Sequence, residues 1–257
     1  MAAYPGGVFN RIMQRGLNRY WSGTAKHVRD MELGPLKTRR IQARRLRAHL
    51  DEVISVADGQ LALPVIGSNS FFIPHGTDWS WRPRLWRESL PQKGMVAVES
   101  REPLGEEITL FHDCDHSELT LRQLRNTREK DLAPYGLRMD VFGFDGSFLS
   151  LVLDMPEAAT EGLSRDHVIR MTTIVEMEKP LEIFARLNIK HGPNTEQIIR
   201  ELPLNKEDIS VEFDLAYTKM NEKQFEKAWI DLIFEGPEMN QVILRDLNFS
   251  RRLRAEV

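Results

Sequence analysis

Apolar and polar side chains alternate over long stretches of the second half of the chain. Between residues 181 and 190 every odd-numbered position is apolar, from Leu181 to Ile189, while the even-numbered positions are mainly polar. A period of two residues is typical of a β-strand that buries one face. Similar patterns occur at residues 207–217, 228–234 and 241–248. These four segments predict an antiparallel β-sheet.

Turn residues and further apolar runs extend this prediction to two sheets. The turn residues at 191–194 and Gly236-Pro237 separate the predicted strands. The long connection at residues 157–166 favours Greek-key or jelly-roll wiring over a barrel. Additional strands are predicted at residues 108–111, 119–124, 137–142, 147–153, 167–178 and 195–202.

The beginning of the chain follows a helical period instead. Apolar residues recur at spacings of three and four from Phe9 to Trp21, and a second stripe recurs every seventh position from Leu36 to Ala57. Both patterns are typical of amphipathic α-helices, and the Gly-Pro pair at residues 34–35 is expected to separate them. We therefore expect a mainly β protein, a two-sheet antiparallel jelly-roll sandwich with an N-terminal α-helical extension. The predicted parts are a basic helical arm (1–60), an irregular Trp/Arg-rich wrapping segment (61–103) and the β-sandwich (104–257).

Charge is distributed unevenly along the chain. Residues 1–50 carry eleven Lys and Arg against two acidic residues, although the net charge of the whole chain is −3. A basic arm on an acidic body predicts contact with an anionic partner or with the body itself. The basic face of the second helix comprises Arg39, Arg40, Arg44, Arg45 and Arg47.

Three interpretations of this basic face stay open. The helices pack on the sandwich or on another protomer, with the arginines solvated or paired to acidic residues. Alternatively, they bind an anionic membrane surface. The third interpretation is nucleic acid, for which no reading motif follows. No apolar run reaches the roughly 18 to 20 residues that span a bilayer, so no transmembrane segment is expected.

Three tryptophans and three arginines are interleaved within residues 79–87. Trp79, Trp81 and Arg82 are candidates for a platform on which sugars or bases stack. In the alternative, the tryptophans wrap one edge of the sandwich and the arginines stack on them.

Side chains that bind metals cluster at residues 112–116. His112, Cys114 and His116 share one face of an extended strand and are weak candidates for a metal site. No second metal-binding motif occurs elsewhere, so a tight turn using Asp113 and Asp115 is favoured, and no cofactor is expected. Cys114 is the single cysteine, and no family signature marks it as a nucleophile. A lone cysteine favours a reducing compartment, so we expect a cytoplasmic protein, with peripheral membrane attachment if the arm binds a membrane.

Three segments carry a resemblance to known proteins: Asp-Gly-Ser-Phe-Leu-Ser-Leu at 145–151, Trp-Ile-Asp-Leu-Ile-Phe at 229–234 and Ile-Leu-Arg-Asp-Leu at 243–247. Their order and pattern resemble the galactose-binding-domain-like jelly rolls used by many carbohydrate-binding modules. The whole sequence also resembles an uncharacterised bacterial protein family. The jelly-roll resemblance covers roughly residues 104–249 and implies the sandwich fold, but no ligand residue at a given position.

One strand face combines aromatic, basic and amide side chains. Phe184, Arg186 and Asn188 point the same way, and neighbouring strands could add either Glu212 and Asp214 or Trp229 and Asp231. An aromatic ring beside paired donors and acceptors suits sugar rings and hydroxyl groups. The alternative is a solvated face with cross-strand ion pairs, or a face covered by the helices.

The sequence favours a non-catalytic binding or scaffold protein whose sandwich binds a carbohydrate-like ligand or a partner protein. One alternative is a peripheral adaptor whose basic N-terminal helices bind an anionic membrane or nucleic acid. Another is a hydrolase acting on glycans, with a pair of carboxylates across a cleft. An enzyme is not favoured because no catalytic motif is present. The carboxylates considered for hydrolysis are Glu182, Glu212, Asp214 and Asp231.

Overall fold

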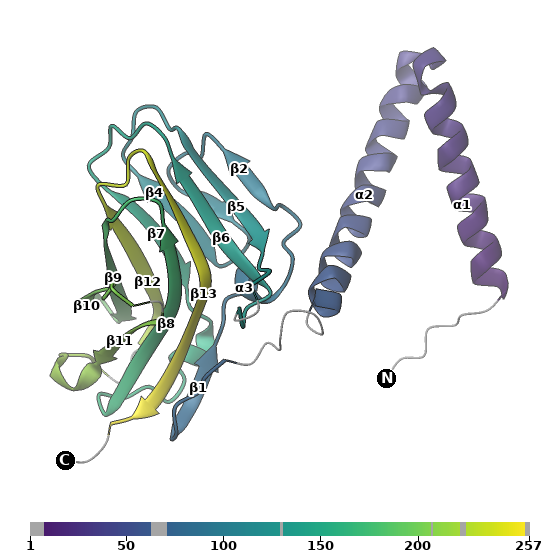
Figure 1. Cartoon of the computed structure of the whole chain (residues 1–257). Helices are drawn as coiled ribbons and strands as arrows, with labels where there is room; N and C mark the ends of the chain where they lie inside the picture. Colours follow the sequence, from purple (N-terminus) through teal and green to yellow (C-terminus); the bar gives the residue numbers. More distant parts are fainter. Residues whose placement is uncertain (1–7, 63–70, 129–130, 207, 222–224, 255–257) are drawn as a thin grey trace. The chain divides into compact units, whose positions relative to one another are not determined.

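The computed structural model describes residues 8–62, 71–128, 131–206, 208–221 and 225–254 (Figure 1). Contacts divide the chain into two units, residues 1–53 and residues 54–257. The first unit is helical and the second contains all the strands. The finer division into three parts at residues 60 and 103 stays a prediction.

The two predicted helices are present, and the second extends past the boundary at residue 53. Helix α1 (Val8–His27) is followed by a short 3₁₀ turn, η1 (Val28–Asp30), and by α2 (Leu33–Ala62). The expected break at residues 34–35 is wrong in position, because the chain leaves the helix at residues 31–32 and Pro35 lies in the first turn of α2. Proline is tolerated there since the first N–H groups of a helix have no intrahelical acceptor.

Two antiparallel sheets form the sandwich (Figure 1). The seven-stranded sheet has the order β11 (Asp208–Asp214), β8 (His167–Met177), β13 (Asn240–Leu253), β6 (Tyr135–Val141), β5 (Leu119–Arg125) and β2 (Gly94–Val96), with β1 (Thr77–Trp81) paired to β13. The six-stranded sheet has the order β10 (Asn194–Glu201), β9 (Glu182–His191), β12 (Phe225–Glu235), β7 (Leu149–Asp154), β4 (Ile108–His112) and β3 (Glu102–Leu104). The predicted mainly β jelly-roll sandwich with N-terminal helices is therefore confirmed.

The core lies between the sheets and consists of the alternating apolar positions. Ile183, Ala185 and Leu187 on β9 are fully buried, as are Ile230 and Leu232 on the adjacent β12. The residues between them point to the outer face of the six-stranded sheet, because successive side chains of a strand alternate. The period of two thus decides which side chains are available outside.

Strands that follow one another in the second half of the chain belong to different sheets. β9, β10 and β12 lie in the six-stranded sheet, whereas β11 and β13 lie in the seven-stranded sheet. The expectation of a single sheet over residues 181–248 was therefore wrong. Alternation shows that a strand buries one face, but it does not show to which sheet the strand belongs. Residues 215–217 form a 3₁₀ turn, η3 (Leu215–Tyr217), instead of continuing β11. The Asp214 carboxylate accepts a hydrogen bond from the Ala216 N–H at 3.0 Å and starts this turn.

The segment predicted to be irregular contains regular structure. β1 pairs with β13, and a short helix, α3 (Arg84–Arg87), precedes β2. Trp79 and Trp81 pack against the core, and the Trp81 ring stacks on Phe249 with 5.4 Å between centroids. Only five residues form β1, so its alternation was too short to stand out among the Trp, Arg and Pro residues around it.

Candidate functional site

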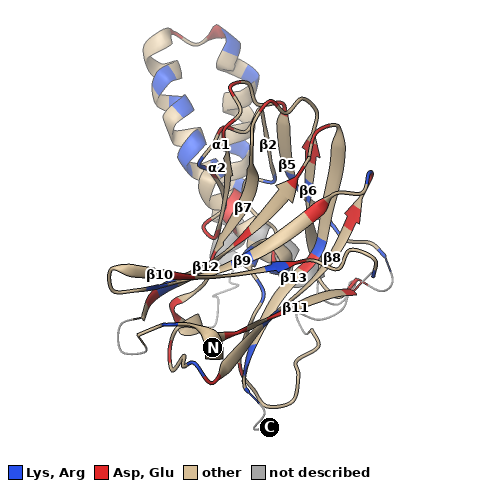
Figure 2. Ribbon diagram, turned by 90° about the vertical axis from the view of Figure 1, so that its left-hand side faces the viewer, with Lys and Arg blue, Asp and Glu red and all other residues tan. Residues whose placement is uncertain are grey.

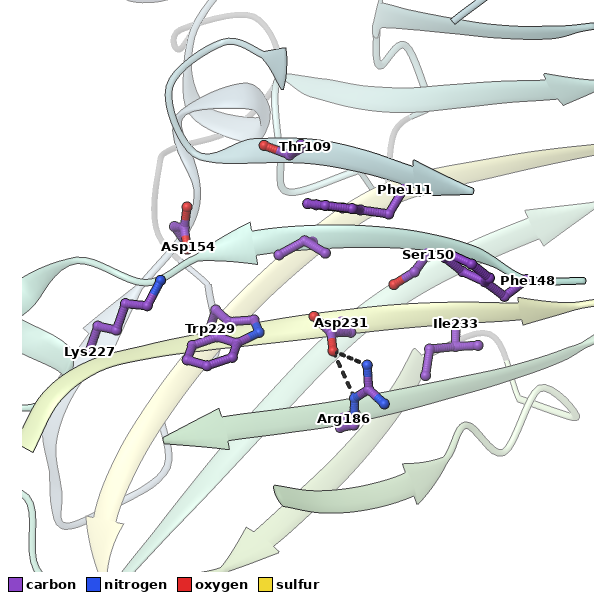
Figure 3. Close-up of a pocket in the computed structure, with 11 residues that line it drawn as sticks. Thr109, Phe111, Phe148, Ser150, Asp154, Arg186, Lys227, Trp229, Asp231 and Ile233 are labelled. Atoms are coloured by element: carbon purple, nitrogen blue, oxygen red, sulfur yellow. Dashed lines mark hydrogen bonds and ion pairs between the residues drawn. The ribbon is translucent and has the colours of Figure 1, made fainter. Parts of the chain in front are cut away.

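A groove of about 520 Å³ lies on the outer face of the six-stranded sheet (Figure 3). Its floor is formed by β4, β7, β9 and β12, and Phe148 contributes to it from the turn before β7. The lining residues are Thr109, Phe111, Phe148, Ser150, Val152, Asp154, Arg186, Lys227, Trp229, Asp231 and Ile233.

Strand register brings these residues together from distant parts of the sequence. Asp231 on β12 lies opposite Arg186 on β9 and opposite Val152 on β7. Ser150 on β7 in turn lies opposite Phe111 on β4. Directly opposed side chains on one face of a sheet are within contact range. Four strands therefore assemble one continuous surface.

An ion pair occupies the middle of the groove. Arg186 donates from Nε and Nη2 to Asp231 Oδ2, at 2.7 Å and 2.6 Å. The same oxygen accepts a hydrogen bond from Asn188 Nδ2 at 3.1 Å, and Gln197 donates to Asn188 Oδ1 at 2.9 Å. Asn188 and Asp231 are buried, whereas the Arg186 side chain is 33% exposed. The buried residues thus hold the guanidinium in place and leave it accessible.

Aromatic side chains lie on both sides of this ion pair (Figure 3). Trp229 lies on one side, and the Lys227 ammonium is 4.8 Å from the centre of its ring. Phe148 lies on the other side, and Phe111 reaches the groove from β4. Aromatic faces combined with fixed charged groups can bind a ligand that has both apolar and polar surfaces.

Asp113 fixes the turn that carries Phe148. Its Oδ1 accepts hydrogen bonds from the Ser147 N–H at 2.7 Å and the Phe148 N–H at 3.2 Å, and its Oδ2 accepts one from the Ser147 hydroxyl at 2.6 Å. These hydrogen bonds, that of the Ser147 hydroxyl above all, lower the pKa of Asp113. A Cβ on Gly146 would meet Asp113 Oδ1 at 2.6 Å, so a larger residue there would displace the Asp113 carboxylate. The Asp113 side chain therefore binds the turn before β7, 34 residues further along the chain.

The residues predicted for a ligand on β9 have different positions. Arg186 lines the groove, and Asn188 lies beneath it as a support for Asp231. Phe184 is half-buried on the same outer face, opposite Ile233, and is not among the lining residues. Their role in binding stays a prediction.

Sequence reasoning missed the β4 and β7 side of the groove. Thr109, Phe111, Phe148, Ser150 and Asp154 come from there, and Lys227 was missed on β12. Phe111 and Phe148 gave one usable signal, because each is aromatic at a position that alternation directs away from the core.

Trp79, Trp81 and Arg82 lie together at the edge of the sandwich. The two tryptophan rings stack with 6.4 Å between centroids and pack on the core. Arg82 is 2% exposed and donates from Nη2 to Asp246 Oδ2 at 2.8 Å. The tryptophans thus pack on the sandwich, but Arg82 lies over the Phe71 ring and not over a tryptophan, and a ligand platform here stays a prediction.

In the cluster at residues 112–116, both ring nitrogens of His112 form hydrogen bonds with backbone groups. His112 is buried, its Nε2 donates to the Val98 carbonyl at 2.9 Å, and its Nδ1 accepts from the Cys114 N–H at 3.2 Å. Burial raises the pKa of the Cys114 thiol. In the described part of the chain, no three His, Cys, Asp or Glu residues are grouped to hold a metal.

The carboxylates considered for hydrolysis do not meet in one cleft. Glu212 and Asp214 lie on β11 in the seven-stranded sheet, whereas Glu182 and Asp231 belong to the six-stranded sheet. Asp231 alone among these four lines the groove.

The arginines of the arm lie along α2 (Figure 2). Arg40, Arg44, Arg45 and Arg47 are exposed, and Arg47 pairs with Asp51 at 3.1 Å. Arg39 is half-buried, with its guanidinium 5.1 Å from the centre of the Tyr20 ring on α1. No helix in the described residues is long and apolar enough to cross a bilayer.

Comparison with protein families places the chain in one of them. The model of the Family of unknown function (DUF6478) matches residues 1–257, so the chain belongs to this family. No curated protein matches the sequence.

Several solved structures are similar to part of this chain. The enzymatically active domain of Bacteriophage CBA120 tailspike protein 4 aligns with a TM-score of 0.40 and 7% identity, over 55% of this chain and 19% of its own. The family 11 carbohydrate-binding module of Clostridium thermocellum, in complex with a mixed-linked tetrasaccharide, aligns with a TM-score of 0.40 and 9% identity, over 64% of this chain and 99% of its own. The CBM22-1 xylan-binding domain of Paenibacillus barcinonensis Xyn10C gives 0.36 and 12%, over 61% and 92%. Similarity at this level transfers no ligand to this chain, so the case for a ligand depends on the groove.

Proposed function

We propose that this member of a family of unknown function is a non-catalytic carbohydrate-binding protein and that the groove on the six-stranded sheet binds the sugar. The observation behind this proposal is the exposed guanidinium of Arg186, fixed by Asp231, between Trp229 and Phe148. Sugar rings have apolar faces that stack on aromatic rings, and their hydroxyl groups both donate and accept hydrogen bonds.

The size of the groove supports a small ligand. Its volume of about 520 Å³ lies within the range of roughly 300 to 1,000 Å³ typical of ligand sites. A stable protein partner buries about 800 Å² on each side, a much larger area than a local groove. The predicted partner protein is therefore the less favoured occupant.

The arrangement of charges supports binding without catalysis. A glycosidase needs two carboxylic groups about 5 to 9.5 Å apart, one of them with a raised pKa. Burial raises the pKa of Glu107 and of Asp246, and neither residue lines the groove. Two carboxylates line the groove, Asp154 and Asp231, and the second is held by Arg186 and Asn188, as suits a group that orients a donor.

A glycan array followed by calorimetric titration of the full chain tests the proposal. We expect binding to an oligosaccharide and a loss of affinity of about tenfold or more for Trp229→Ala, because a stacking surface is removed. Phe142→Ala is the matched control, since Phe142 is an exposed aromatic residue outside the groove. Absence of glycan binding, or equal affinity of the Trp229→Ala protein and the unchanged protein, would refute the proposal.

We also propose an independent adaptor role in which the N-terminal helices bind an anionic partner. Exposed Arg40, Arg44 and Arg45 in a segment with almost no acidic residues support it. Binding should weaken steeply with ionic strength. Replacement of these three arginines by glutamine should weaken it too and leave glycan binding unchanged. Binding that resists both salt and these replacements would contradict this role.

A further inference from the structure

Helix α1 exposes a continuous apolar stripe. Met13, Leu17 and Tyr20 are 52%, 45% and 44% exposed. At about 3.6 residues per turn, these three side chains fall within a stripe roughly 60° wide. A helix in water normally buries such a stripe, so the exposed face requires a cover.

The opposite side of the same helix is basic. Arg15, Arg19 and Lys26 are exposed and lie across the helix from the apolar stripe. The sequence of α1 contains no acidic residue. A basic face opposite an apolar face is the arrangement of helices that lie in a membrane interface.

Aromatic residues adjoin the stripe. Tyr20 and Trp21 meet edge to face with 5.4 Å between ring centroids. Rings with a polar atom favour the boundary between headgroups and hydrocarbon, because one end is apolar and the other remains hydrated.

Helix α2 adds positive charge to the arm. Lys37, Arg40, Arg44 and Arg45 are exposed, and the contact of Arg39 with the Tyr20 ring connects α2 to α1. Each basic residue near an anionic lipid surface adds to the attraction.

We infer that the anionic partner of the arm is a phospholipid bilayer and that α1 lies in its interface with Met13, Leu17 and Tyr20 inserted. This inference rests on the proposed adaptor role. Nucleic acid would neutralise the arginines but leave the apolar stripe in water. A second copy of the arm would cover the stripe but bring two strongly basic segments together. An anionic bilayer would bury the apolar stripe and attract the basic residues at the same time.

The test measures co-sedimentation of the full chain with vesicles. One set contains phosphatidylcholine alone, and the other contains equal parts phosphatidylcholine and phosphatidylserine. We expect binding to the second set, weakened by added salt. Replacement of both Met13 and Leu17 by glutamine should reduce binding about tenfold or more, because two inserted side chains are lost. Glutamine has nearly the helix propensity of leucine and methionine, and circular dichroism verifies that the helices persist.

Two further measurements separate this inference from the adaptor role. Phe142→Gln, at an exposed site on the sandwich, should bind vesicles like the unchanged protein. Binding of duplex DNA should be insensitive to the change at Met13 and Leu17. DNA binding without vesicle binding would support the adaptor role but would overturn the inference that the partner is a bilayer. Binding to neither would overturn both. Self-association that is lost on changing Met13 and Leu17, in a protein that ignores vesicles, would assign the stripe to a second copy and overturn the bilayer.

Discussion

Each sheet of the sandwich has an Arg–Asp ion pair on its outer face, and the two pairs have opposite surroundings. We call Arg186–Asp231, on the six-stranded sheet, the open pair, and Arg82–Asp246, on the seven-stranded sheet, the covered pair. Both aspartates are about 5% exposed, but the side chain of Arg186 is 33% exposed and that of Arg82 only 1%. The difference lies in access to the guanidinium.

Phe71 contributes to the cover of the second pair. The Arg82 guanidinium lies 4.9 Å from the centre of the Phe71 ring. Burial raises the pKa of Asp246, although Arg82 acts in the opposite direction. Arg82 Nε and Nη1 and Asp246 Oδ1 have no hydrogen-bond partner among the described residues. The same two residue types thus leave a guanidinium accessible when one side is open, and are shut off from water when both are enclosed.

Removal of each arginine gives the largest expected contrast. Arg82→Ala should lower the free energy of unfolding by about 3–5 kcal/mol, because it leaves the Asp246 carboxylate buried without its partner. Arg186→Ala should cost about 1–2 kcal/mol, since water enters the open groove and hydrates Asp231. Urea unfolding at neutral pH measures both. Equal losses would contradict the distinction between the open and the covered pair.

A double-mutant cycle with Phe71 sharpens the comparison. If the Phe71 ring keeps water away from Asp246, Arg82→Ala should be less destabilising in the Phe71→Ala background, because water can then hydrate the unpaired carboxylate. We expect a coupling of about 1 kcal/mol in the free energy of unfolding. Phe72→Ala is the control, because the neighbouring Phe72 is largely exposed. Additive losses for Phe71 and Arg82 would show that Phe71 does not enclose the pair.

The smallest effect is expected at the edge of the open groove and depends on pH. The pKa of Asp113 is lowered in the folded state, so its stabilisation is present above the unfolded pKa of about 3.9. This contribution is lost as pH falls through the lower folded-state value. The difference in melting temperature between the unchanged protein and Asp113→Asn should therefore be largest at neutral pH and shrink in acid.

Ser147→Ala serves as the comparison for Asp113, since it removes the hydroxyl that lowers the pKa most. It should show the same trend with a smaller amplitude. A difference between the unchanged protein and Asp113→Asn that is constant with pH would rule out the carboxylate as the source. The affinity of the unchanged protein for the glycan should also fall in acid, because the ionised Asp113 positions Phe148.

The strands from β4 to β13 and the outward direction of Arg186 followed from the sequence, because alternation is a local property. The pairing of Arg186 with Asp231 was within reach once both were assigned to neighbouring strands. The position of Phe111 and Phe148 in the same groove as Trp229 was not, since it depends on the order of β4, β7 and β12 in the sheet. The covered pair was also hidden, because Arg82 and Asp246 are separated by 164 residues.

The position of β13 has a consequence for synthesis. β13 follows every other strand of the sandwich in the sequence, yet it lies inside the seven-stranded sheet and pairs with β8, β6 and β1 (Figure 1). A chain that leaves the ribosome N-terminus first presents the basic helices long before β13 appears, and β6 and β8 have no partner between them until then. The seven-stranded sheet therefore closes only after β13 has emerged from the ribosome, and β6 and β8 wait for their common partner until then.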